Sequence, residues 1–126
     1  MSDKTVLICD DEPLIREAIA YAVKKEGHQF MMAEDGGEAF LKASENKPDL
    51  ILLDVGMPVM TGFEVCERLR ASENGDKYII VIITAFGQAD DIEKAKKAGA
   101  TRFISKPFSP RDLREVIRDL LSAEAD

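Results

Sequence analysis

Charged and hydroxyl side chains follow four of the short apolar runs in this 126-residue sequence. They are Asp10, Asp11 and Glu12 after the first run, Asp54 after the third, Thr84 after the fourth and Lys106 after the fifth. Each has an ordinary explanation when it is considered alone, such as acids at a helix start, where they interact favourably with the helix dipole. Together they indicate a site, because ligands of parallel α/β sheets bind outside the carboxyl ends of the strands.

The three aspartates would repel one another if their strands were neighbours. Adjacent strands lie about 4.8 Å apart, and two like charges about 4 Å apart repel by roughly 4 kcal/mol in a protein environment. Mg²⁺ would relieve this repulsion, since it prefers oxygen ligands and keeps waters that a phosphate can replace. We expect it at Asp10, Asp11 and Asp54, with Asp11 binding directly and Asp10 beside it or acting through water. The carbonyl of Gly56 is a further expected ligand, because the chain turns sharply there.

This set of side chains suits phosphoryl transfer onto a carboxylate, in which positioning and charge neutralisation do most of the catalysis. Asp54 is the candidate nucleophile, because it ends the most apolar run and lies centrally among the acids. Thr84 could donate a hydroxyl hydrogen bond to one oxygen of an added phosphoryl group. Lys106 could pair with another oxygen and supply a second positive charge.

Five strands, each followed by a helix, must position these side chains. The expected strands are 5–9, 29–33, 50–53, 78–83 and 102–104, and apolar residues at helical spacing follow each of them. Residues 34–36 are interpreted as an ordinary turn. Gly27 and Gly99 are expected to end helices in the left-handed conformation, and Ser109 with Pro110 is expected to begin the last helix.

The continuous apolar run at 50–53 predicts a strand buried on both faces. The fold class is therefore α/β, a doubly wound five-stranded parallel sheet with helices on both faces. The length and the 45% apolar content fit one domain, residues 1–126.

The composition indicates where in the cell the protein acts and which classes of binding partner are disfavoured. The net charge of −7 disfavours binding to nucleic acid and to anionic membranes. Cys9 and Cys66 lie in apolar surroundings and are expected to be buried free thiols. With neither a signal peptide nor an apolar run long enough to span a bilayer, the sequence predicts a soluble cytoplasmic protein.

The ordered motifs resemble the receiver domain of two-component response regulators over essentially the whole chain. The motifs are Val6-Leu7-Ile8-Cys9-Asp10-Asp11-Glu12, Leu52-Leu53-Asp54-Val55-Gly56-Met57-Pro58, Ile83-Thr84-Ala85, Gly99-Ala100 and Lys106-Pro107-Phe108. The resemblance implies the flavodoxin-like strand order 2-1-3-4-5, which is carried over from the family. It also implies that Asp54 accepts a phosphoryl group from a sensor histidine kinase or a histidine phosphotransfer protein, with Mg²⁺ as cofactor.

The resemblance also implies which residues would change position when the domain is phosphorylated. The Lys106–Pro107 bond would be cis, Thr84 would move toward the phosphoryl group, and Phe103 would be the aromatic residue that turns inward. Phe103 could equally be an ordinary core residue. A receiver of this kind is expected to be no enzyme in the usual sense but a stoichiometric phosphoacceptor that catalyses its own phosphorylation and slow dephosphorylation. Its output would pass to a downstream protein target or to an effector domain outside this chain.

Three positions depart from the family pattern. Gly56 and Phe86 flank the route of attacking water in the family, so the lifetime of the phosphoryl group can differ in either direction. Residues 101–103 lack the paired aspartates of many DNA-binding regulators. This puts in doubt the dimer that such regulators form through their fourth helix, fifth strand and fifth helix.

Two alternative functions stay open. One is a degenerate receiver that only binds proteins. The other is a flavodoxin-like FMN protein, although Asp10 and Asp11 would repel the FMN phosphate.

Overall fold

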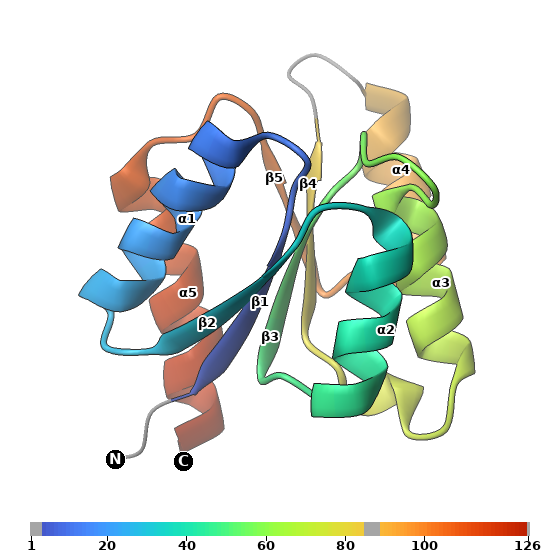
Figure 1. Ribbon diagram of the computed structural model, residues 1–126, viewed down its shortest axis with the longest axis horizontal. Coiled ribbons are helices and arrows are strands. Elements are labelled where there is room, and N and C mark those ends of the chain that lie inside the picture. The colour runs from blue at the N-terminus through green and yellow to red at the C-terminus, as the bar shows by residue number, and fades with distance from the viewer. Residues whose placement is uncertain (1–3, 85–88, 126) are drawn as a thin grey trace.

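The computed structural model describes residues 4–84 and 89–125, and it alternates five strands with five helices (Figure 1). The elements are β1 (Thr5–Cys9), α1 (Pro13–Lys25), β2 (Gln29–Ala33), α2 (Gly36–Asn46), β3 (Leu50–Asp54), α3 (Gly62–Ala71), a 3₁₀ turn η1 (Gly75–Lys77), β4 (Ile80–Thr84), α4 (Ala89–Ala98), β5 (Arg102–Ser105) and α5 (Pro110–Ala125). All strand pairs are parallel, in the order β2-β1-β3-β4-β5. The predicted fold class and strand order are confirmed.

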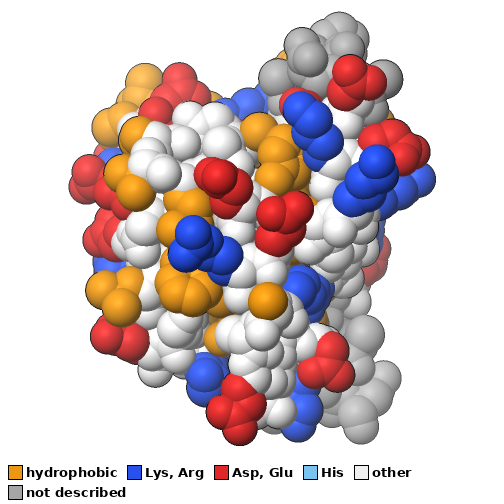
Figure 2. Space-filling view, turned by 90° about the vertical axis from the view of Figure 1, so that its right-hand side faces the viewer, with side chains coloured by type: hydrophobic (Ala, Val, Ile, Leu, Met, Phe, Trp, Pro, Cys, Tyr) orange, Lys and Arg blue, Asp and Glu red, His pale blue; other side chains and the backbone are white. Residues whose placement is uncertain are grey.

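The sheet separates two apolar layers. Alternate residues of the central strands point to opposite faces, so Leu53 packs with α2, α3 and α4 while Leu52 packs with α1 and α5. Every residue of β3 is buried, which explains why its first four residues, 50–53, form a continuous apolar run. On the side formed by α2, α3 and α4, acidic and basic side chains are interspersed with small apolar areas (Figure 2).

Strand boundaries differ from the prediction by one or two residues. Asp54 is the last residue of β3 and pairs with Ile83, so the strand extends through the carboxylate rather than ending before it. Thr84 likewise ends β4, opposite Ser105. The prediction ended these strands too early because a polar side chain does not interrupt backbone pairing. Tyr78 was expected in β4 but follows η1 instead.

The helix boundaries confirm most of the predicted signals. Gly27 and Gly99 have φ values of +84° and +94°, and the Ser109 hydroxyl accepts a hydrogen bond of 3.0 Å from the Asp112 amide. Residues 34 and 35 form a bend, as interpreted, whereas Gly36 already belongs to α2. Asp35 is the N-cap of α2, and its carboxylate accepts a hydrogen bond from the Glu38 amide at 2.8 Å.

The side chain of Arg70, which the sequence does not mark, connects α3 to two chain segments that precede strands. Its guanidinium donates to the carbonyls of Gly99, Gly75 and Tyr78 at 2.7–2.8 Å. It also donates to the hydroxyl of Thr101, which in turn accepts from the backbone amide of Ile80. Thr101 therefore joins β4 to the start of β5 in this chain.

The structure bears on two further predictions, that both cysteines are buried free thiols and that no apolar run is long enough to span a bilayer. Cys9 and Cys66 are free and buried, as predicted. Burial raises the pKa of Cys66 to about 11, so its thiol stays protonated near neutral pH. Within residues 4–84 and 89–125, no helix is long and apolar enough to cross a lipid bilayer.

Glu26, at the end of α1, binds two arginines of α5. Arg118 donates to its two carboxylate oxygens at 3.0 and 2.8 Å, and Arg114 donates at 3.0 Å. The hydrogen bond from Arg118 is the largest effect on the pKa of Glu26 and lowers it. Burial acts in the opposite direction, and Arg114 lowers the pKa further.

We predict that Glu26→Gln lowers the free energy of unfolding by about 1 kcal/mol at pH 7. A carboxyl group with a lowered pKa in the folded state stabilises the fold above its ordinary pKa. That contribution is lost as the pH falls through the folded value. The difference between wild type and variant, measured by urea unfolding, should therefore be constant above about pH 5 and shrink below it.

Glu115→Gln is the control, since Glu115 also lies near arginines of α5 but its ion pair with Arg111, at 3.8 Å, is exposed. Its effect should stay below about 0.5 kcal/mol. A Glu26→Gln effect that did not change with pH would contradict the assignment of its stabilising contribution to the ionised carboxylate.

Candidate functional site

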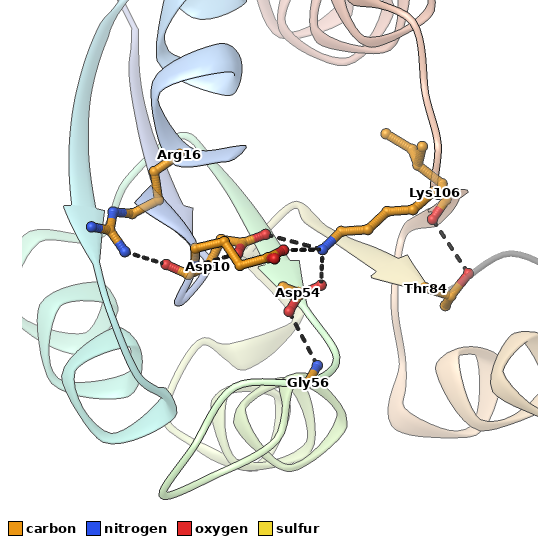
Figure 3. Close-up of polar contacts among 8 residues, drawn as sticks. Asp10, Arg16, Asp54, Gly56, Thr84 and Lys106 are labelled. Carbon is orange, nitrogen blue, oxygen red and sulfur yellow. Dashed lines mark hydrogen bonds and ion pairs between the residues drawn. The ribbon is translucent and has the colours of Figure 1, made fainter. Parts of the chain in front are cut away.

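Lys106 contacts carboxylates that lie at the ends of different strands (Figure 3). Its ammonium nitrogen lies 2.9 Å from Oδ1 of Asp54, at the end of β3, and 3.4 Å from Oδ2 of Asp10, which follows β1. A third carboxylate, that of Glu12, lies 3.5 Å away. The structure thus brings together the lysine and two of the predicted acids at the carboxyl edge of the sheet.

Asp11 completes the predicted acidic cluster. One carboxylate oxygen from each of Asp10, Asp11 and Asp54 lies within 4.8 Å of the others. Asp10 and Asp54 are buried, whereas Asp11 is exposed. The cluster therefore has two fixed carboxylates below the surface and one that faces solvent.

Asp10 supplies an observation that fits a cation. Its Oδ1 accepts a hydrogen bond of 2.9 Å from the Glu12 amide. Its Oδ2 is buried and, within the described residues, accepts no hydrogen bond, although it forms the ion pair with Lys106 at 3.4 Å. Burial is the largest cause that raises the pKa of Asp10, and the charge of Asp54 adds to it. The Glu12 amide and Lys106 act in the opposite direction. A buried oxygen that accepts no hydrogen bond, beside two more carboxylates, fits the oxygen-rich donor set that Mg²⁺ prefers.

Lys106 remains charged despite its partial burial. Burial is the largest single effect and lowers its pKa, but the contacts with Asp54 and Asp10 together outweigh it, so the pKa lies above its ordinary value. Lys106 thus supplies a positive charge beside the carboxylates, and its pairing with a phosphoryl oxygen stays a prediction.

Asp54 is held through both of its oxygens. Oδ1 contacts Lys106, and Oδ2 accepts a hydrogen bond of 3.2 Å from the backbone amide of Gly56. A Cβ atom at position 56 would lie 3.6 Å from Oδ2, an ordinary contact, so space alone does not require glycine there. The Gly56 carbonyl as a metal ligand stays a prediction.

Thr84 lies at the same edge of the sheet, but its hydroxyl contacts β5. It is 3.4 Å from the Ile104 carbonyl and 3.5 Å from the Ser105 hydroxyl. The Thr84 carbonyl accepts a hydrogen bond of 2.8 Å from the Lys106 amide, which ties the two positions together through the backbone. Its role toward a phosphoryl group stays a prediction, and Phe86 lies outside the described residues.

Two expectations concern β5 and the residues after it. The Lys106–Pro107 peptide bond is cis, as the resemblance implied. Phe103 is 37% exposed, so the alternative that it is a core residue is wrong. The reason is that β5 is an edge strand in which most residues are exposed. A role for Phe103 as a switch stays a prediction.

The loop from β3 to α3 forms one wall of the pocket and has two features that the sequence analysis missed. The Gly36 amide donates a hydrogen bond of 3.1 Å to the Pro58 carbonyl, and a Cβ atom on Gly36 would overlap the Met60 carbonyl. Val59 has a φ of +73° and is 80% exposed, and the Met60 amide bonds back to Pro58 across it at 2.8 Å. A β-branched residue rarely adopts this conformation, so Val59 is strained.

The protein is an α/β protein with a doubly wound parallel sheet. Three aspartates and a lysine form an acidic pocket at the carboxyl ends of its strands, where ligands of such sheets bind. The family model of the response regulator receiver domain matches residues 6–118. The chain therefore belongs to the receiver-domain family of response regulators, the phosphoacceptors of two-component signalling. This membership excludes the FMN-protein alternative.

The relatives differ in length. The chain is 42% identical over 113 residues to the phosphate regulon transcriptional regulatory protein PhoB of Pseudomonas aeruginosa, with 90% of this chain and 49% of PhoB covered. It thus spans about half of that relative. It is 31% identical over 126 residues to sporulation initiation phosphotransferase F of Bacillus subtilis, with all of both chains covered.

Solved structures show the same architecture. Chemotaxis response regulator CheY4 of Vibrio cholerae superposes with a TM-score of 0.88 at 32% identity, covering 94% of this chain and 99% of CheY4. The receiver domain of sensor histidine kinase PA1611 from Pseudomonas aeruginosa PAO1 has a TM-score of 0.87 at 26% identity, covering 96% of this chain and 99% of that one. That structure has a magnesium ion coordinated in its active site cleft.

We predict that Val59→Gly raises the free energy of unfolding by about 1 kcal/mol. Relief of the strained φ should exceed the added flexibility of glycine in the unfolded chain. Val59→Ala, which keeps the Cβ atom, is the matched control and should give a much smaller gain in urea unfolding. Equal gains from the two variants would show that the exposed isopropyl group, rather than the backbone, causes the effect.

Proposed function

We propose that Asp54 is the phosphoacceptor and that the donor is a phosphohistidine of a sensor histidine kinase or a histidine phosphotransfer protein. The observation that carries this assignment is the position of Asp54, nearly buried at the end of the central strand β3, with Oδ1 only 2.9 Å from Lys106. In the reaction a carboxylate oxygen of Asp54 attacks phosphorus. The bond between phosphorus and the histidine nitrogen breaks, and its electron pair stays on the imidazole.

The groups around Asp54 support this chemistry. The Gly56 amide holds Oδ2 and the Lys106 ammonium holds Oδ1, so the carboxylate is oriented before a donor arrives. Lys106 would then pair with an oxygen of the transferred group, where its charge offsets the added negative charge. Thr84, at the end of the neighbouring strand, would donate its hydroxyl to another oxygen.

We propose that Asp10, Asp11, Asp54 and the Gly56 carbonyl hold Mg²⁺. When bound, the ion neutralises the carboxylates and the oxygens of the transferring phosphoryl group. Oδ2 of Asp10 supports this assignment, because it is buried and, within the described residues, accepts no hydrogen bond, with the Lys106 ammonium 3.4 Å away. The clustering of the three carboxylates within 4.8 Å supports it too.

The wider role follows from these assignments. The chain, 1–126, would act as one receiver domain and as a stoichiometric phosphoacceptor that catalyses its own phosphorylation and slow dephosphorylation. Its phosphorylated surface would act on a downstream protein target or on an effector domain outside this chain, without direct contact with nucleic acid or membrane. The net charge of −7 supports the last point, and a cytoplasmic location is part of the proposal.

Incubation with acetyl phosphate and Mg²⁺ tests the acceptor directly by intact-protein mass. Wild type should gain one phosphoryl mass, and the gain should disappear with Asp54→Ala or with a chelator. Asp76→Ala, which removes an exposed aspartate in η1, is the control and should gain it normally. No gain in wild type would favour the degenerate receiver, and a gain that persists in Asp54→Ala would place the acceptor elsewhere.

Lys106→Ala should separate acceptance from signalling. Because Lys106 contacts but does not replace the nucleophile, the variant should still be phosphorylated, more slowly than wild type and far more readily than Asp54→Ala. The amide resonances of α5 should no longer shift on phosphorylation, because Lys106 is the charge that joins the acceptor to the segment leading into α5. Wild-type shifts in the phosphorylated variant would refute this role.

A further inference from the structure

Arg16 of α1 binds the backbone of the buried pocket aspartate from the side opposite Lys106 (Figure 3). Its Nη1 donates a hydrogen bond of 2.7 Å to the carbonyl oxygen of Asp10. Asp10 has no exposed surface, so water does not reach this carbonyl. A buried carbonyl needs a donor from the protein.

The fold explains why a side chain supplies that donor. The Asp10 amide still bonds to the Ala33 carbonyl at 3.2 Å, but beyond this point the chain after β2 turns to cap α2 through Asp35. Pro13, the first residue of α1, has no N–H group to offer. In the described part of the chain, Arg16 is the one donor to the Asp10 carbonyl.

Arg16 is itself held in place. Its backbone amide donates to the Glu12 carbonyl at 3.0 Å, so its position in the first turn of α1 is fixed. Its charge also acts on the carboxylate of Glu38 in α2. The pKa of Glu38 is lowered chiefly by the hydrogen bond from the Glu34 amide, then by Lys42, with a smaller contribution from Arg16.

We propose that Arg16 is a positioning residue for the acidic pocket. By binding the Asp10 carbonyl it fixes the backbone from which the Asp10 carboxylate projects, and thereby strengthens binding of a divalent cation at the pocket. The inference rests on the proposed function, because it assumes that the pocket holds Mg²⁺. Partners that orient a metal ligand without touching the metal typically change affinity by about 10-fold to 100-fold.

The sign of the effect separates positioning from charge. A guanidinium near the pocket repels a divalent cation, so removal of the charge alone would tighten Mg²⁺ binding. Loss of positioning would weaken it. A residue that only stabilised the fold would leave the affinity of the folded protein unchanged.

The test is isothermal titration of Mg²⁺ into wild type, Arg16→Met and Arg70→Met, at a temperature at which circular dichroism shows all three to be folded. Methionine keeps most of the stem volume and removes the donors. Arg70 is the matched control, since it makes several hydrogen bonds to backbone carbonyls but lies in α3, away from the carboxylates. We expect about a tenfold higher Kd for Arg16→Met and an unchanged Kd for Arg70→Met.

The outcomes distinguish this inference from the function on which it rests. If wild type neither binds Mg²⁺ nor gains a phosphoryl group, the proposed function fails. If wild type does both, an equal or lower Kd for Arg16→Met overturns the positioning role, as does an equal loss in Arg70→Met. Should Arg16→Met not fold, Arg16→Gln replaces it with the same expected direction, because the shorter amide does not span the distance that the arginine covers.

Discussion

Repulsion between the carboxylates of Asp10 and Asp54 is the constraint around which the pocket is built. Both groups are buried at the ends of adjacent strands, where water screens their charges poorly. Lys106 is the only cation that contacts both of them in the described part of the chain. Below this charged edge the sheet is apolar, with residues 50–53 of β3 all buried.

Backbone amides also hold the pocket carboxylates and the neighbouring loop in position. The amides of Glu12 and Gly56 each donate to one carboxylate oxygen, and the Gly36 amide fixes the loop that carries Gly56 through the Pro58 carbonyl. Such donors add no charge and do not change with pH. They orient the acids, and the second oxygen of each carboxylate contacts Lys106.

The sequence predicted the fold class and the charged residues of the site because both follow from side-chain type, whereas the strand order came from the resemblance to the family. Apolar runs mark strands, and a carboxylate or lysine after such a run lies at the ligand-binding edge. The contacts that depend on backbone carbonyls were not predictable in this way. Arg70 and Arg16 look like ordinary helix arginines, since the carbonyls that they bind leave no pattern in the sequence. Val59 follows no turn signature, because valine is unusual at a positive φ.

The order of the elements along the chain has a consequence for synthesis. Asp10, Asp11 and Asp54 all lie within the segment from β1 to β3, which forms a contiguous part of the sheet. Lys106 follows β5, which joins the sheet last in chain order and pairs only with β4. A growing chain therefore contains all three aspartates before its own counter-ion has been made. Once Lys106 is in place it offsets one of the three negative charges, so the finished pocket keeps a net negative charge that favours a divalent cation.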